Sequence, residues 1–200
     1  MANSPGKDSG RLRQVLAALA RYGLLMKQDK LLPSVVGLVT QQALASSWWS
    51  HPLAHDIFAL LEVLSERSDV LETKLIGGKV TFVCQALWPA WLGVAQSNEA
   101  WQRVGLSPAA RRLLTEVTRL GEREASGAAP KELEQRMLVR SEQRHTASGR
   151  HVLVLESWAR WADRKAIPAL SSAEGKSALE AAARGLGASS KALPWSTRSR

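Results

Sequence analysis

Apolar residues recur every three or four positions along three stretches near the start of the chain. The stretches cover residues 11–27, 33–44 and 52–67, and the second and third of them open with a proline. This spacing places the apolar side chains on one face of a helix, and proline suits the first helical turn. The pattern therefore predicts three consecutive helices.

The period changes in residues 70–84, where apolar and polar positions alternate on both sides of the glycine pair 77–78. Alternation is the period of a strand, and adjacent glycines suit a two-residue hairpin turn because they readily adopt positive φ angles. Such a turn sets Lys74 beside Thr81 across the two strands. We expect a hairpin with one packed apolar face and one open face that carries Lys74, Lys79 and Thr81.

The helical period returns in the second half of the chain. Residues 86–96 form a short, Trp-rich apolar stretch, residues 107–122 form an amphipathic one, and residues 172–186 form an Ala-rich one. Ser107 is a typical N-cap, and Pro108 stands at the first helical position after it. These three stretches are predicted to be helices.

Residues 136–155 are interpreted as a second hairpin, because HTASG is a turn signal and HVLVL is rich in strand-forming residues. The first arm has a helical alternative. A spacing of four residues puts Arg136, Arg140 and Arg144 on one face in a helix and also in a strand. In both cases that face is basic, and a Trp-containing helix is predicted to follow.

The order of elements indicates an α+β protein that is mostly helical, with two winged-helix-like units in tandem. Each unit consists of helices and a β-hairpin. We expect the first unit in residues 11–100 and the second in residues 101–186. Residues 1–10 and 187–200 are polar and basic, and we expect both ends to be disordered.

The charge is distributed unevenly. The net charge of the 200 residues is +9, with an excess of acidic residues in positions 31–100 and a basic excess elsewhere. A basic protein with basic ends favours a polyanionic partner, because Lys and Arg on phosphates release counterions. The first eleven residues have no apolar segment of a signal peptide, and no run approaches the roughly 20 apolar residues of a membrane helix. We expect a cytoplasmic protein with DNA, and no membrane, as its partner.

The residues that could bind a metal do not match a known pattern. His51 and His55 are four positions apart, but the Glu that follows the first His in H-E-x-x-H is replaced by Pro52. The single Cys84 excludes a zinc site built on several cysteines. We expect no metal and no cofactor.

The candidate nucleic-acid contacts fall into three groups. They are polar and basic residues on the two hairpins, arginines on the outward face of the helix after Ser107, and two adjacent tryptophans. The helix before the first hairpin is apolar and acidic, so the Arg-rich second unit is the better candidate for DNA. A solvated charged face and packed tryptophans are the alternative interpretation. The candidates are Lys74, Lys79, Thr81, Arg111, Arg112, Arg136, Arg140, Arg144, Trp48 and Trp49.

Several motifs resemble one bacterial family. The chain is similar to the small AlkZ-related proteins, short relatives of the AlkZ (YcaQ) winged-helix DNA glycosylases, which remove alkylated or crosslinked bases. The resemblance covers roughly residues 11–165 and implies a tandem winged-helix fold and a link to DNA. It rests on SWWSHP, KLIGGKVTFV, LWPAWL, LSPAARRLL and RSEQRHTASGRHVLVLESW.

The catalytic motif of the family is altered here. The resemblance implies a Gln-x-Gln motif that positions water. In this chain Gln41 and Gln42 are adjacent instead, which places them about 100° apart on a helix. We therefore expect a non-catalytic DNA-binding protein. The first alternative is a glycosylase in which Gln41 or Gln42 orients water and Asp56 or Glu72 acts as base. The second alternative is a protein-interaction module.

Overall fold

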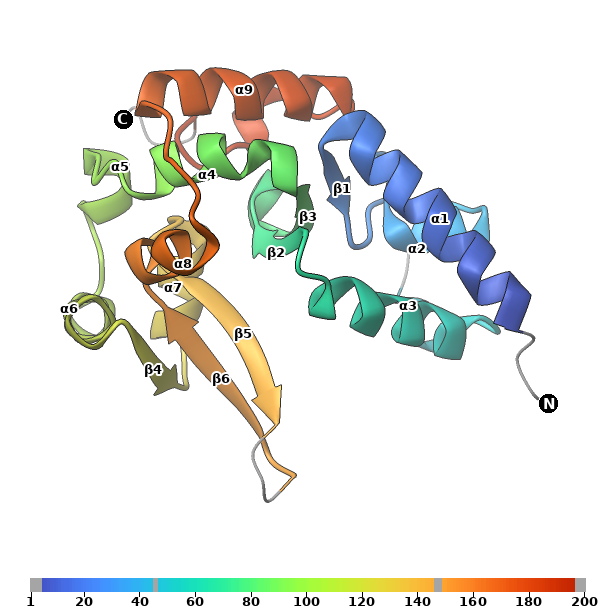
Figure 1. The fold of residues 1–200 in the computed structure, drawn as a ribbon, viewed down its shortest axis with the longest axis horizontal. Helices are drawn as coiled ribbons and strands as arrows, with labels where there is room; N and C mark the ends of the chain where they lie inside the picture. The colour runs from blue at the N-terminus through green and yellow to red at the C-terminus, as the bar shows by residue number, and fades with distance from the viewer. Residues whose placement is uncertain (1–4, 45–46, 146–148, 197–200) are drawn as a thin grey trace.

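The first unit is built from three helices and a three-stranded sheet. A computed structural model describes residues 5–44, 47–145 and 149–196 of the chain. The strand late in the unit, β3, lies between the other two, so the sheet order is β1-β3-β2 (Figure 1). The elements are α1 (Pro5–Tyr22), β1 (Leu24–Met26), α2 (Val35–Thr40), α3 (Ala54–Glu66), β2 (Val70–Lys74) and β3 (Val80–Cys84).

The strand β1 replaces the end of the helix that was predicted over residues 11–27. Gly23, with a φ of +74°, ends α1. The next three residues are buried on both faces and pair with Val83, Phe82 and Thr81. A short apolar run has no periodicity that separates a buried strand from a helix end, so the sequence pattern could not reveal it.

The first hairpin is confirmed, but its register differs from the prediction by one residue. Thr73 pairs with Thr81, and Lys74 pairs with Val80. The connection is a five-residue loop that contains a 3₁₀ turn, and Gly77 and Gly78 have φ angles of +59° and +68°. Thr81, Phe82 and Val83 are all buried, because β3 is the central strand and both of its faces are covered.

The second unit repeats this arrangement with one helix fewer. Its sheet order is β4-β6-β5, again with the last strand in the centre (Figure 1). The predicted hairpin is confirmed, and its first arm is a strand. The fold is therefore α+β and mostly helical, with two winged-helix-like units in tandem. The elements are α6 (Pro108–Leu120), β4 (Glu122–Ala125), α7 (Ala129–Gln135), β5 (Arg140–His145) and β6 (His151–Glu156).

Four more helices join the units around a shared core. The helix α9 lies alongside α4 (Figure 1). Their backbones approach closely, because a Cβ atom at Gly175 would lie 2.4 Å from the carbonyl oxygen of Ala90. The boundary expected near residue 100 therefore does not separate two independent cores. These helices are α4 (Trp88–Ala95), α5 (Ala100–Arg103), α8 (Trp158–Lys165) and α9 (Ser172–Gly185).

The shared core contains residues from both units. Trp88 and Trp91 come from α4, and Trp158 and Trp161 come from α8. The ring centroids of Trp88 and Trp161 are 4.9 Å apart, and those of Trp91 and Trp158 are 5.6 Å apart, both in edge-to-face geometry. These contacts hold the first and second units together.

Parts of both chain ends belong to defined elements. Residues 5–10 belong to α1, and residues 187–196 follow a defined path that includes the 3₁₀ turn η4 (Ser190–Ala192). Leu193 is completely buried in the shared core. The polar composition of residues 187–200 did not indicate two apolar anchors of this segment, Leu193 and Trp195. Residues 1–4 and 197–200 lie outside the described part.

Leu193→Ala is expected to lower the free energy of unfolding by about 2–5 kcal/mol, because the substitution leaves a cavity in the core. Chemical denaturation monitored by circular dichroism measures the change. Leu31→Ala serves as the matched control, since Leu31 is almost fully exposed. Equal stability of the two variants would show that the C-terminal segment does not pack in solution.

Candidate nucleic-acid interface

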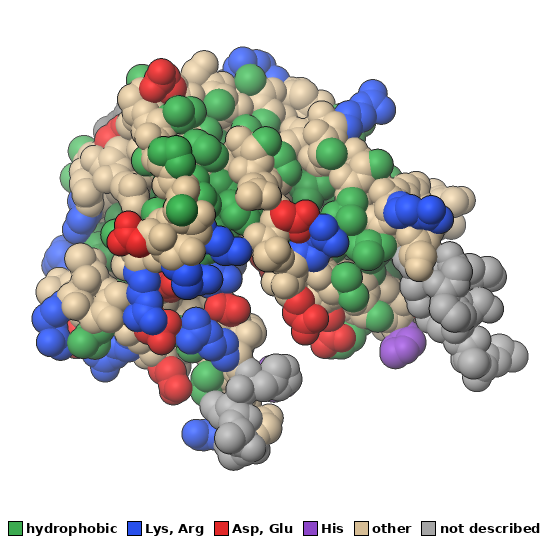
Figure 2. Space-filling view, in the orientation of Figure 1, with side chains coloured by type: hydrophobic (Ala, Val, Ile, Leu, Met, Phe, Trp, Pro, Cys, Tyr) green, Lys and Arg blue, Asp and Glu red, His purple; other side chains and the backbone are tan. Residues whose placement is uncertain are grey.

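The molecule is hollowed between the β5–β6 hairpin and α3 (Figure 2). Blue side chains gather over α8 and the root of the hairpin on one side of the hollow, with acidic side chains among them. Acidic side chains gather on the opposite side. Glu62 and Glu66 of α3, the helix on that side, are exposed. Phosphates would therefore be attracted to the second unit and repelled by α3.

The local sequence fixes the position of the basic side chains on α8. Ser157 caps this helix, and its hydroxyl accepts a hydrogen bond from the backbone N–H of Arg160. Arg160 and Arg164 are four residues apart and thus lie on one face of the helix. Their side chains are 46% and 51% exposed.

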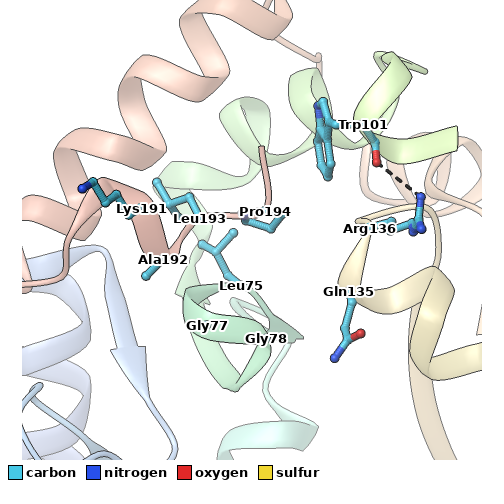
Figure 3. A pocket seen from close by; sticks show the side chains of 10 residues that line it. All are labelled: Leu75, Gly77, Gly78, Trp101, Gln135, Arg136, Lys191, Ala192, Leu193 and Pro194. Carbon is cyan, nitrogen blue, oxygen red and sulfur yellow. Dashed lines mark hydrogen bonds between the residues drawn. The ribbon is translucent and has the colours of Figure 1, made fainter. Parts of the chain in front are cut away.

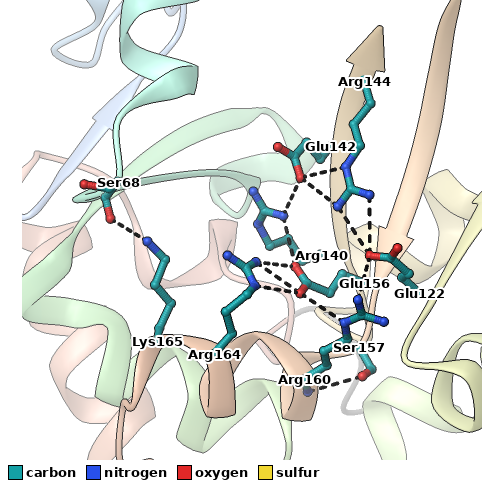
Figure 4. A network of polar contacts seen from close by, with 10 residues as sticks. All are labelled: Ser68, Glu122, Arg140, Glu142, Arg144, Glu156, Ser157, Arg160, Arg164 and Lys165. Carbon is teal, nitrogen blue, oxygen red and sulfur yellow. Dashed lines mark hydrogen bonds and ion pairs between the residues drawn. The ribbon is translucent and has the colours of Figure 1, made fainter. Parts of the chain in front are cut away.

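A buried carboxylate organises these arginines. Glu156, at the end of β6, is 2% exposed. It accepts hydrogen bonds from Arg140 at 3.1 Å and from Arg164 at 2.9 Å, and Arg160 lies 4.0 Å away (Figure 4). A buried carboxylate is stable only when paired, and here several guanidinium groups provide the pairing.

Two further carboxylates belong to the network. Arg144 lies 3.4 Å from Glu122 and 3.3 Å from Glu142 (Figure 4). Burial alone would raise the pKa of Glu142, but the hydrogen bond from Arg140 and the charges of Arg140 and Arg144 outweigh it, so the pKa lies below its usual value. Glu142 is therefore ionised at neutral pH and neutralises part of the arginine charge.

We name this group the arginine cluster. It contains five cations and three carboxylates, which leaves a net charge of +2. Lys165 is also occupied, because it donates to the carbonyl oxygen of Ser68 at 3.0 Å (Figure 4). The half-exposed guanidinium groups of Arg160 and Arg164 are the most accessible of the cations. The members are Arg140, Arg144, Arg160, Arg164, Lys165, Glu122, Glu142 and Glu156.

Arg136 is buried and does not belong to this surface, which corrects its assignment as a nucleic-acid contact. It follows α7, and the strand begins only at Arg140. Its guanidinium group donates to the carbonyl oxygens of Trp101, Gln102 and Val104. Carbonyl groups at a helix end need donors from outside the helix, and Arg136 supplies them to α5.

Three other candidates on the first unit are also engaged or buried. Lys79 pairs with Asp29 at 2.7 Å, and Lys74 pairs with Glu134 of the second unit. Thr81, predicted on an open face, is fully buried and contacts the sulfur of Met26. Thr81 is therefore a core residue and cannot contact a phosphate.

Arg111 and Arg112 are exposed on α6, as the amphipathic pattern predicted. The guanidinium group of Arg111 donates to the carbonyl oxygen of Leu106 at 2.6 Å. Neither residue contacts the arginine cluster through a hydrogen bond or ion pair in the described part of the chain. They form a separate basic face of the second unit.

The adjacent tryptophans have different environments. Trp48 is buried, whereas Trp49 is 65% exposed. Their rings stack with centroids 4.1 Å apart, and Trp49 also lies 6.2 Å from Phe58. Trp48 is thus a core residue, and Trp49 belongs to an exposed aromatic pair on the first unit.

The candidate catalytic residues lie on three different elements, the end of α2, α3 and β2. Gln41 ends α2 in the left-handed conformation, and both Gln41 and Gln42 are exposed. Asp56 forms an ion pair with Arg11. Glu72 lies on β2 with Lys27 4.0 Å away. Within the described residues, no hydrogen bond or ion pair joins Gln41, Gln42 and Glu72 to one another.

Glu72 has an unusual titration behaviour. Burial raises its pKa above 4.5, the charge of Lys27 lowers it, that of Glu134 raises it, and that of Lys74 lowers it again. The folded state therefore holds this proton more strongly than the unfolded chain does. The free energy of unfolding should fall as the pH rises from about 4.5 through the higher folded pKa.

Glu72→Gln is expected to remove this loss of stability, because glutamine has nearly the same shape and does not ionise. The variant should melt at a higher temperature than the wild type at pH 7 and show a smaller difference at pH 4. Thermal melts across this range measure the effect. Glu62→Gln, at an exposed position of α3, is the control. A wild-type advantage at pH 7 would contradict the assigned burial penalty.

Sequence reasoning identified the basic second unit but missed Arg160 and Arg164. The sequence did contain a signal for them. Ser157 favours a helix start, and Arg160 and Arg164, which follow it, are four residues apart. Their relation to Glu156 depends on how β6 and α8 pack, and no local pattern indicates it.

Among the described residues, no helix combines the length and the apolar character that crossing a bilayer requires. The same residues contain no group of three or more His, Cys, Asp or Glu placed to hold a metal ion. No family model matches the sequence, and no curated protein or solved structure is significantly similar to it.

Proposed function

We propose that the protein binds duplex DNA through its second winged-helix-like unit, without catalysis. The observation that carries the proposal is the concentration of cations there. Residues 101–165 contain thirteen Lys and Arg and eight Asp and Glu, a net charge of +5. Residues 11–100 contain eight and seven, a net charge of +1. Electrostatic attraction to phosphates would therefore act mainly on the second unit.

The shape of the second unit supports the same proposal. Its β5–β6 hairpin projects from the body of the protein beside the arginine cluster (Figure 1). Arg160 and Arg164 expose about half of their side chains at the base of this projection. Guanidinium groups bind phosphate oxygens with two parallel hydrogen bonds, so this surface suits contacts along a DNA backbone.

The acidic α3 surface supports the assignment to the second unit. In DNA-binding helix-turn-helix proteins, the corresponding helix enters the major groove. Here Glu62 and Glu66 are exposed at its C-terminal end, and the apolar Phe58 is exposed nearer its start. Insertion of this helix would bring two carboxylates towards phosphates. We infer that α3 stays outside the groove.

The direct test is fluorescence anisotropy with a labelled 20-base-pair duplex at several salt concentrations. Binding should weaken steeply as salt rises, with a slope of log K against log[salt] of about −0.9 for each phosphate contacted. Affinity that hardly responds to salt would instead favour the protein-interaction alternative.

Glu142→Gln gives an independent prediction. The substitution removes one carboxylate from Arg140 and Arg144. If the cluster contacts phosphates, the extra net positive charge should raise duplex affinity by about threefold to tenfold near 0.1 M salt. Glu62→Gln on α3 changes the net charge equally and is the matched control. An equal gain for both variants would show a general charge effect and contradict the site.

A further inference from the structure

A pocket of about 320 Å³ lies where three parts of the chain meet (Figure 3). The loop between β2 and β3 forms its base, α5 and the end of α7 form one side, and the C-terminal segment forms the other (Figure 3). The pocket lies at the small end of the range for ligand sites, about 300–1,000 Å³. It is lined by Leu75, Gly77, Gly78, Trp101, Gln135, Arg136, Lys191, Ala192, Leu193 and Pro194.

The charge of the lining favours an anion. Two of the ten lining residues are cations, Arg136 and Lys191, and none is acidic. Arg136 is buried, its guanidinium group donates to three carbonyl oxygens and it forms an ion pair with Glu132 at 3.7 Å, so Lys191 is the cation that a ligand can reach. Lys191 is exposed at the rim, and its ammonium group has no ion-pair partner in the described residues.

The aromatic wall of the pocket is fixed in position. The indole N–H of Trp101 donates to Glu99 at 2.9 Å. Glu99 is held in turn by Ser172 and Lys176 of α9. The ring of Trp195 lies 6.0 Å from that of Trp101 and supports it. A ring held in this way can stack with a flat ligand at little entropic cost.

The pocket also offers an amide without an internal partner. Gln135 ends α7 and points toward Gly78, whose hypothetical Cβ atom would lie 3.3 Å from the amide nitrogen. The side chain of Gln135 forms no hydrogen bond within the described part of the chain. An amide supplies one acceptor and two donors, which is the combination that pairs with the edge of a purine.

We propose that this pocket binds a nucleoside monophosphate, with the base against Trp101, the base edge on Gln135 and the phosphate toward Lys191 at the rim. The nucleotide could be a free molecule or the phosphorylated end of a nucleic-acid strand, since both present the same groups. The inference goes beyond duplex binding. Its residues are separate from the arginine cluster, so each proposal can fail without the other.

Isothermal titration calorimetry with adenosine 5′-monophosphate tests the site. The nucleotide should bind saturably with a dissociation constant below about 1 mM. Adenosine and inorganic phosphate should each bind at least tenfold more weakly, because each lacks one half of the recognised groups. Absence of saturable binding would overturn the site, and equal binding of either fragment would overturn the assigned ligand.

Three variants assign the binding to this pocket. Gln135→Ala and Lys191→Met should each weaken nucleotide binding by about fivefold to tenfold, whereas Lys131→Met, on the exposed side of α7, should leave it unchanged. All three positions are at least partly exposed, and thermal melts verify that each variant folds. Unchanged binding in both pocket variants would place the nucleotide elsewhere and refute the proposal.

Oligonucleotides distinguish the two sources of the ligand. A 5′-phosphorylated ten-nucleotide single strand should displace the mononucleotide if the site takes strand ends, and its unphosphorylated counterpart should not. If neither displaces it, the ligand is a free nucleotide. Displacement by both strands equally would show that the 5′-phosphate is not recognised, which contradicts the proposed role of Lys191.

Discussion

Replacement of Arg160 and Arg164 together by glutamine is expected to weaken duplex DNA binding by roughly fiftyfold near 0.1 M salt. Each phosphate contact contributes about 0.9 to the slope of log K against log[salt]. At 0.1 M salt this contribution corresponds to an affinity about eightfold higher than at 1 M salt. The slope itself should therefore fall by about 1.8. Anisotropy titrations at several salt concentrations measure both quantities.

Glutamine is the appropriate substitute because it keeps a hydrogen-bond donor near the buried Glu156. Arg140 remains in place to neutralise that carboxylate. The matched control is Arg13→Gln with Lys30→Gln, which removes two exposed cations from the first unit. If the control pair loses as much affinity as the α8 pair, binding depends on net charge alone. If neither loses affinity, the second unit is not the DNA interface.

Trp161→Ala is expected to lower the free energy of unfolding of the whole protein by about 3–5 kcal/mol. Trp161 is almost fully buried, and its ring contacts those of Trp88 and Trp158 at centroid distances of 4.9 and 5.5 Å. Since Trp88 belongs to the first half and Trp161 to the second, the loss should affect both units in one cooperative transition. Urea unfolding followed by circular dichroism gives the free energy and the slope m.

Trp49→Ala is the control for this prediction. Because the Trp49 ring is mostly exposed, its removal should lower the free energy of unfolding by about 1 kcal/mol or less. A second, separate transition in Trp161→Ala would show that the two units fold independently. That result would contradict the shared core, since a residue common to both units cannot destabilise only one of them.

Helix positions could be predicted well where the pattern is long and capped. Ser107 caps α6 as expected, with its hydroxyl accepting from the N–H of Ala110. By contrast, β1 has only three residues, and these are buried on both faces. Nothing in such a run separates strand from helix, because the decisive contact is with β3, more than fifty residues later.

The register of the first hairpin shows a second limit. Both the predicted and the observed pairing keep the glycines in the turn, but the observed loop is longer, and Thr81 is buried where an open face was expected. The addition of β1 to the other side of β3 makes β3 a central strand. A central strand is covered by neighbours and side chains that the local alternation does not indicate.

The candidate site was predictable only in outline. An excess of cations in the second half is visible in the sequence, but their availability is not. Lys74 is paired with Glu134, which is 60 residues away, and Arg136 is occupied by carbonyl groups of a preceding helix. Arg160 and Arg164 remain half exposed although Glu156 lies beside them.

The amino-acid sequence alone determined the helical periods, the caps, the two hairpins and the basic character of the second half, since each of these depends on residues close together in the chain. The tertiary structure decided which cations face solvent, which tryptophan is exposed and how the C-terminal segment closes the shared core. Ion pairing and burial join residues that are far apart in sequence, and only the packing of the complete chain brings them together.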